Sequence, residues 1–163
     1  MSQLFSFPNP VNDYSARLVA GAVVILVILF EITANEVLLL FITYGFLARV
    51  LTGPTLSPIG LLVTKIIIPA LGSPDKPVPG PPKRFAQFIG LVISLLATFA
   101  IFFFDSPTSA RYLMGILCFF ASLESILGFC AGCFVFSWLM KFNVIPESVC
   151  ESCVIDIKTA DLS

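Results

Sequence analysis

Long apolar stretches constrain this chain more than any other feature, because they decide the solvent in which it folds. A transmembrane helix needs about 20 mostly apolar residues. Hydrophobic residues make up 58% of the 163 residues and charged residues only 12%, about half of the roughly 25% found in soluble proteins. A water-soluble domain of this length cannot bury so much apolar surface. The composition therefore predicts an all-α polytopic protein whose main partner is the lipid bilayer.

Four stretches have the length and hydropathy of spans, and we expect them to form a membrane four-helix bundle. They cover residues 15–32, 36–51, 85–104 and 108–140. Asn9-Pro10 and Ser106-Pro107 are pairs typical of helix starts, since Asn and Ser cap a helix and proline suits its first turn.

The last stretch is too long for a simple span. As one straight helix it would measure about 50 Å, against a hydrocarbon core of about 30 Å. It must therefore tilt strongly, project beyond the membrane or break. Gly128 and Gly132 mark the expected place for a break.

A proline-rich loop separates the second and third spans. Residues 52–84 hold eight of the twelve prolines. Within it, Ser57-Pro58 opens an apolar helix over residues 59–68, which we expect Pro69 to end. That helix is too short to span, so it should be interfacial or re-entrant. Residues 76–84 favour extended polyproline II and predict a stiff surface spacer, with a PxxP ligand for a partner as the alternative.

The distribution of basic residues predicts the orientation. Short loops rich in Lys and Arg stay in the cytoplasm. Only Arg111 falls on the opposite side from the other eight, which are Arg17, Arg49, Lys65, Lys76, Lys83, Arg84, Lys141 and Lys158. We therefore expect a multi-pass protein of the plasma membrane with both termini cytoplasmic, in which residues 1–142 form the membrane domain and residues 143–163 a cytoplasmic tail.

Four of the five cysteines form two CxxC pairs, and these carry most of the chemistry available to the chain. Cys130 and Cys133 lie in the last apolar stretch, and Cys150 and Cys153 lie in the tail. The absence of histidine excludes a His-based triad, His-ligated haem and mixed Cys/His zinc sites. The net charge of −1 gives no basic surface for nucleic acid.

The leading interpretation is a cytosol-facing dithiol relay, in which the tail pair exchanges disulfides or sulfane sulfur with a soluble partner and with the inner pair. The reactivity of the inner pair depends on the long helix. If the helix breaks at Gly128, Cys130 lies at a new helix N-terminus, where the dipole favours a thiolate. If the helix is continuous, burial keeps the thiols protonated.

Two other interpretations stay open. The first is binding or transport of a soft metal ion such as zinc or copper, because Cys130, Cys133, Cys150 and Cys153 together have the numerical spacing of a four-cysteine site. The second is a membrane scaffold without chemistry, in which the Gly128-x-x-x-Gly132 pattern and the cysteines, including Cys118, serve packing. No feature names a substrate or cofactor, so enzyme activity is also left open.

Glu124 is a further candidate, because a carboxylate inside a span is costly and usually functional. It could carry protons or bind metal, or it could be the buried partner of Arg49, Arg17 or Gln87. On a straight helix it lies about 120° from Cys130, so it would not act on that thiol.

Several phrases of the sequence resemble one family. These are residues 7–12, 53–60, the proline-rich residues 76–87, and the two CxxC segments at 128–133 and 146–153. They are similar to a bacterial family of small integral membrane proteins labelled as domain of unknown function 4395. The resemblance implies a four-span protein of the bacterial inner membrane with two dithiols, working near thioredoxin-like or sulfurtransferase proteins.

Overall fold

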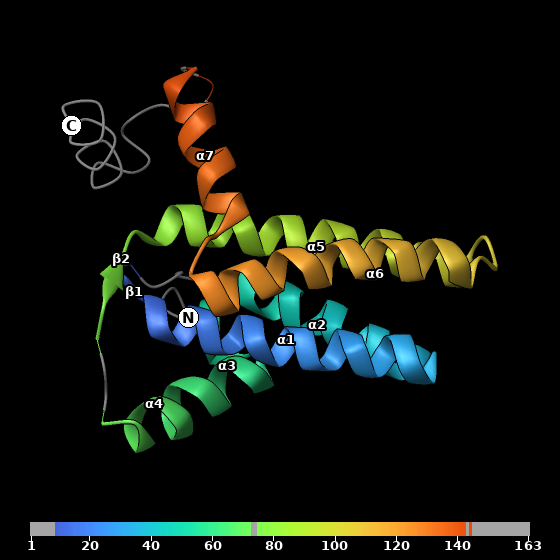
Figure 1. Cartoon of the computed structure of the whole chain (residues 1–163), viewed down its shortest axis with the longest axis horizontal. Coiled ribbons are helices and arrows are strands. Elements are labelled where there is room, and N and C mark those ends of the chain that lie inside the picture. Colours follow the sequence, from blue (N-terminus) through green and yellow to red (C-terminus); the bar gives the residue numbers. More distant parts are fainter. Residues whose placement is uncertain (1–8, 73–74, 143, 145–163) are drawn as a thin grey trace.

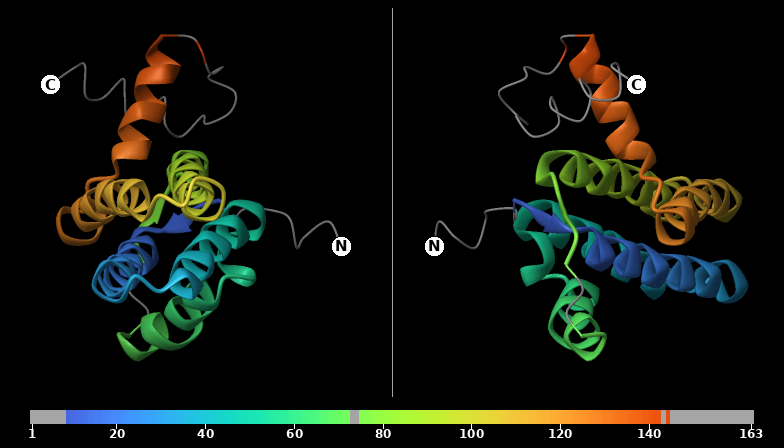
Figure 2. Two further views of the ribbon diagram at one scale, coloured as in Figure 1. Left: turned by 90° about the vertical axis from the view of Figure 1, so that its right-hand side faces the viewer. Right: turned by 60° about the vertical axis from the view of Figure 1, so that its left-hand side comes forward.

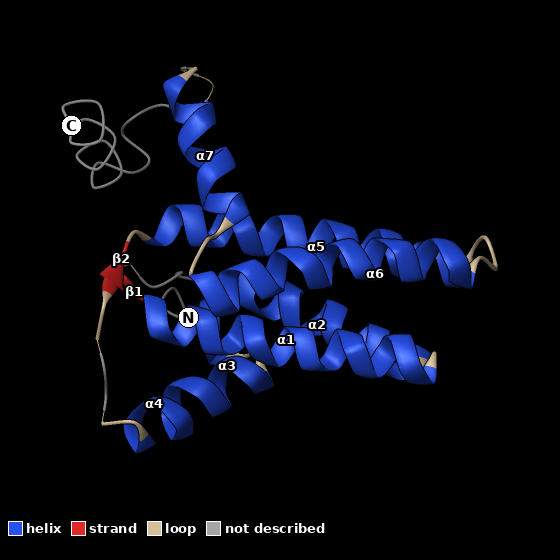
Figure 3. Cartoon of the chain, viewed as in Figure 1, coloured by secondary structure: helices blue, strands red, loops and turns tan. Residues whose placement is uncertain are grey.

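A computed structural model of the chain describes residues 9–72, 75–142 and 144. Helices account for nearly all of it (Figure 3). Four are long and apolar enough to cross a membrane. The predicted fold class, an all-α membrane four-helix bundle, is confirmed, and the protein is a multi-pass membrane protein.

The first two spans form a helical hairpin. Helix α1 (Asp13–Thr33) and helix α2 (Glu36–Thr52) are joined by a turn in which Ala34 has a φ of 50°. Asn35 caps α2 by accepting a hydrogen bond from the Val37 amide. Asn12, not Asn9, caps α1, because the side chain of Asn9 instead accepts the Gly80 amide at the start of a distant helix.

The loop helix lies at the end of the bundle where α1 begins (Figure 1). It consists of α3 (Pro58–Leu62), a π-helical turn (Val63–Ile67) and α4 (Ile68–Ala70). Val63 and Ile68 pack against Val19 of α1. The helix ends at Ala70, one residue beyond Pro69, where it was expected to end. The wider π-helical turn before Pro69 accommodates a residue without an N–H group.

The proline-rich segment is extended only in part. Strand β2 (Pro77–Val78) pairs antiparallel with strand β1 (Val11–Asn12). Helix α5 (Gly80–Phe102) then begins five residues before the predicted start at Phe85. The expectation of an extended chain through residue 84 was wrong, because the first turn of a helix makes no use of the amide hydrogens that Pro81 and Pro82 lack. As a result Lys83 lies on a spanning helix.

The core of the bundle is apolar, and so is its outer surface. Helix α5 packs between α2 and α6 (Pro107–Ser122), and α1 packs against α6 (Figure 2). The largest fully buried apolar side chains are Phe30, Leu39, Ile42, Met114, Val27 and Val63. Large hydrophobic side chains are exposed on every spanning helix, as expected for a surface in contact with lipid.

The long fourth stretch breaks. Helix α6 continues through a π-helical turn (Leu123–Leu127) and ends at Gly128, whose φ is 70°. Helix α7 (Ala131–Lys141) then leaves the bundle at a steep angle (Figure 1). Of the three outcomes left open by the sequence, the structure has the break at Gly128, and the fourth spanning helix is Pro107–Leu127.

Helix α7 touches the bundle through a glycine. A Cβ atom placed on Gly132 would lie 2.5 Å from the Cα and the Cβ of Ala86 on α5. Only glycine permits such a close approach. The Gly128-x-x-x-Gly132 pattern therefore has two separate uses, a left-handed turn at the first glycine and a helix crossing at the second.

Candidate functional site

A buried cluster of charges joins three helices at the end of the bundle where α1 and α5 begin. The Lys83 Nζ atom lies 2.9 Å from Glu124 Oε1 and 3.2 Å from Asp13 Oδ1. The side chains of Lys83 and Asp13 are each 8% exposed and that of Glu124 is 13% exposed. Lys76, which is 60% exposed, reaches the second oxygen of Asp13 at 3.5 Å.

This cluster shows that Lys83 is the charged partner of Glu124. The partners expected from the sequence were Arg49, Arg17 or Gln87, and that expectation was wrong. Lys83 was missed because its segment was assigned to an extended loop. The signal that could have found it is Pro81-Pro82, which suits the first turn of a helix and extends the third span backwards over Lys83.

Arg49 and Gln87 pair with each other instead. The Arg49 Nε group donates to Gln87 Oε1 at 2.8 Å, and its Nη1 group donates to Ser57 Oγ at 3.2 Å. The guanidinium also lies over the Phe46 ring, 4.6 Å from its centroid. Since Arg49 is only 4% exposed, these contacts replace the water that a buried cation would otherwise require.

Arg17 closes the end of the fourth spanning helix. Its Nη2 group donates to the carbonyl oxygen of Ile126 at 2.8 Å, and its Nε group to that of Ser125 at 3.4 Å. These carbonyls lie in the last turn, where a helix leaves oxygens without internal partners. A cation at this position also interacts favourably with the helix dipole. Arg17 therefore stabilises the break at Gly128.

The break places Cys130 at the N-terminus of α7. Cys130 is the capping residue, with φ −94° and ψ 103°, and its Sγ atom accepts the backbone N–H of Cys133 at 3.3 Å. Cys130 is 9% exposed, and Cys133 is half-buried. Both are free thiols, as is Cys118, which packs against the apolar core.

The two thiols of this pair differ in acidity. The pKa of Cys130 is lowered, chiefly because the Cys133 thiol donates a hydrogen bond to its sulfur. Lys83 and the Cys133 amide lower it further, while burial and Glu124 oppose them. The pKa of Cys133 is raised, because it is the donor in that bond and is itself buried. Cys130 is therefore the more acidic thiol of the pair, and Cys133 is the less acidic.

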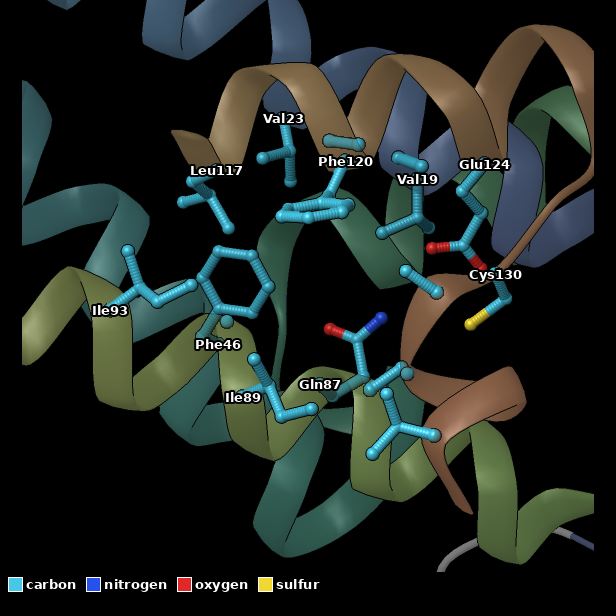
Figure 4. A pocket seen from close by; sticks show the side chains of 17 residues that line it. Val19, Val23, Phe46, Gln87, Ile89, Ile93, Leu117, Phe120, Glu124 and Cys130 are labelled. Atoms are coloured by element: carbon cyan, nitrogen blue, oxygen red, sulfur yellow. The ribbon is translucent and has the colours of Figure 1, made fainter. Parts of the chain in front are cut away.

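Cys130 and Glu124 face one cavity of about 260 Å³ (Figure 4). Its other polar lining residue is Gln87. The walls are apolar and include Val23, Phe46, Ile93, Leu117, Phe120 and Ala121. A straight helix would have held Glu124 and Cys130 on different faces, but the turn at Gly128 brings both to the same space.

The other predicted site residues are not brought into this arrangement. Cys150 and Cys153 lie outside the described residues, as does the rest of the predicted tail from residue 145 onward. Within residues 9–72, 75–142 and 144, no three His, Cys, Asp or Glu side chains are grouped closely enough to hold a metal ion. A four-cysteine metal site would need the tail pair.

We expect the substitution Lys83→Met to destabilise the fold far more than Lys76→Met. Removing Lys83 leaves Glu124 buried without its cation and leaves Asp13 with only the exposed Lys76, a loss of about 3–5 kcal/mol for breaking a buried pair. Removing the exposed Lys76 should cost about 0–1 kcal/mol. Thermal unfolding of the purified variants in one detergent measures the difference.

A matched control is Lys83→Met combined with Asp13→Asn and Glu124→Gln. This variant removes the orphaned charges together with the cation, so most of the lost stability should return. Equal effects of the two single lysine substitutions, or no recovery in the combined variant, would contradict the assignment of Lys83 as the central charge.

Comparison with known proteins identifies the family. Searches of curated proteins and of solved structures gave no significant match. A model of the family described as "Domain of unknown function (DUF4395)" matches residues 11–141, which cover all the spanning helices, the charged cluster and the Cys130–Cys133 pair. The chain therefore belongs to the DUF4395 family of membrane proteins of unknown function.

Proposed function

We propose that this protein carries out thiol–disulfide exchange at the membrane surface through Cys130 and Cys133. The observation that carries the proposal is the position of Cys130 as the cap of α7, with its sulfur accepting the Cys133 amide at 3.3 Å. A helix N-terminus stabilises a thiolate. Redox-active CxxC pairs have this feature in common, whereas cysteines buried for packing are inert.

The lowered pKa of Cys130 favours electron transfer into the disulfide of the pair. Stabilising the thiolate stabilises the reduced form, which makes the corresponding disulfide a stronger oxidant. The Cys130–Cys133 disulfide would therefore accept electrons from a dithiol. A soluble thioredoxin-like protein, or the tail pair Cys150 and Cys153 acting between the two, has the chemistry of such a donor.

The exchange is balanced in two steps. A thiolate of the donor attacks the sulfur of Cys133, the less buried residue of the pair. The Cys130 thiolate leaves, which is favoured by its lowered pKa. The second thiolate of the donor then attacks the donor sulfur that is bonded to Cys133. The Cys133 thiolate leaves and takes up a proton. The donor loses two electrons and becomes a disulfide, and the inner pair becomes a dithiol.

We expect the inner pair to cycle between disulfide and dithiol. In full-length protein with Cys150→Ser and Cys153→Ser, a mild disulfide oxidant should remove two free thiols, and dithiothreitol should restore them. Cys130→Ser or Cys133→Ser in that background should abolish the change, because the remaining sulfur has no partner. Cys118→Ser is the matched control and should leave the change intact.

Three measurements, with metal analysis on the wild-type chain, separate the alternatives. A metal ion that co-purifies with the wild-type chain and is released by a chelator would favour soft-metal binding. A sulfane sulfur attached to Cys130 in mass spectra would favour a sulfurtransferase partner. A thiol count that never changes, with no metal present, would favour a scaffold and defeat the proposal.

The site is proposed to face the cytoplasm. Arg17, Arg49 and Arg84 lie at the same end of the bundle as the charged cluster, and Arg111 lies on α6 near its start, at the opposite end (Figure 1). The positive-inside rule then places the cysteine pair and both termini on the cytoplasmic side of the bacterial inner membrane.

Labelling of introduced cysteines checks the orientation. With the native cysteines replaced by serine, Asp75→Cys and Thr108→Cys place one thiol at each end of the bundle, both at exposed positions. A membrane-impermeant maleimide should label Thr108→Cys on the inner membrane of cells with a permeabilised outer membrane, and Asp75→Cys only after lysis. The reverse pattern would place the cysteine pair on the outer face.

A further inference from the structure

The two thiols of the inner pair face different surroundings. Cys133 is half-buried and lies outside the residues that line the cavity. Cys130 is 9% exposed and lines the cavity bordered by residues of α1, α2, α5, α6 and α7 (Figure 4). A molecule that reacts with Cys130 from this side must therefore enter the apolar interior of the bundle.

The cavity has the size and lining of a site for a small apolar ring. Its volume is about 260 Å³, slightly below the ~300–1,000 Å³ typical of sites for drug-sized ligands. The walls come from spanning helices, and aromatic side chains, Phe46 and Phe120, project into it (Figure 4). A charged cofactor such as a nicotinamide nucleotide would lose its hydration there without compensation.

One neutral donor is available in the cavity for a carbonyl group. Gln87 points into the space (Figure 4). Its Oε1 atom accepts the Nε–H of Arg49 at 2.8 Å, which fixes the orientation of the amide. The Gln87 NH₂ group is thereby the end of the amide that can donate to a ligand.

We propose that the cavity binds the head group of a quinone, which accepts the electrons of the reduced Cys130–Cys133 pair. This inference rests on the proposed thiol–disulfide exchange and supplies its missing step, since a pair that oxidises a soluble dithiol must be reoxidised. Quinones dissolve in the bilayer, take two electrons and two protons, and carry carbonyl oxygens that suit the Gln87 amide.

The reaction balances without another reagent. The Cys130 thiolate and the Cys133 thiol form the S–S bond and give up two electrons to the quinone ring. One proton comes from Cys133, and the second comes from solvent, replacing the proton that Cys130 has already released. Both carbonyl oxygens become hydroxyls, and the quinol leaves the cavity.

The test uses full-length protein in lipid nanodiscs, with Cys150→Ser and Cys153→Ser so that only the inner pair cycles. The protein is reduced, freed of reductant and mixed anaerobically with a short-chain, fully substituted ubiquinone analogue. We expect about one quinol per chain, measured by ultraviolet absorbance, together with the loss of two thiols.

Two substitutions probe the cavity itself. Ala121→Leu fills the space with a larger side chain, and Gln87→Glu replaces the amide donor while keeping an acceptor for Arg49. Each should slow quinone reduction at least tenfold. Ala121→Leu should leave oxidation by a soluble disulfide unchanged. Gly115→Ala, on the same helix where an added Cβ meets no atom within 4 Å, is the control and should behave as the parent.

The outcomes distinguish this inference from the proposed function. If the pair cycles with soluble disulfides but reduces no quinone, the quinone site is refuted and the exchange activity stands. Quinone reduction that is unaffected by both cavity substitutions would also refute the site. If the pair neither cycles nor reduces quinone, both proposals fail.

Discussion

The placement of Lys83 between Asp13 and Glu124 is the interaction on which the rest of the structure depends. Each of these charges lies on a different helix, and each would be costly to bury alone in a bilayer. Because the three are paired within 3.2 Å, the starts of α1 and α5 and the end of the fourth span must meet at one point. The polar end of the bundle is organised around that requirement.

The break at Gly128 comes one turn after Glu124, and it determines where the Cys130 thiol lies. Arg17 donates to the carbonyls at the end of the span, and Gly128 takes up the left-handed conformation at which the chain turns away from the bundle axis. The close contact of Gly132 with Ala86 then fixes α7 against α5. Together these features hold Cys130 at a helix N-terminus and near a lysine, two conditions that favour a thiolate.

The sequence predicts the membrane fold well because hydropathy over about 20 residues is a strong signal. The presence of four spans and of the short loop helix follows from it. The position of Lys83 could not be predicted from hydropathy. The run of prolines was interpreted as extended, although two of them occupy the first turn of α5. The proximity of Glu124 to Cys130 also could not be predicted, because it depends on whether the helix breaks, and glycine permits a break without requiring one. Arg17 favours the break by donating to the carbonyls that precede it, and it comes from a helix more than a hundred residues away in the sequence.

The central claim is that the fold lowers the pKa of the Cys130 thiol, and titration of that thiol tests it most directly. In full-length protein with Cys118, Cys150 and Cys153 replaced by serine, thiolate absorbance or the rate of alkylation is followed against pH. The account predicts that Cys130 ionises first, with a midpoint below that of an ordinary cysteine thiol. The thiolate and its reactivity should therefore persist to lower pH than in an ordinary cysteine. A first midpoint at or above that value would contradict the account.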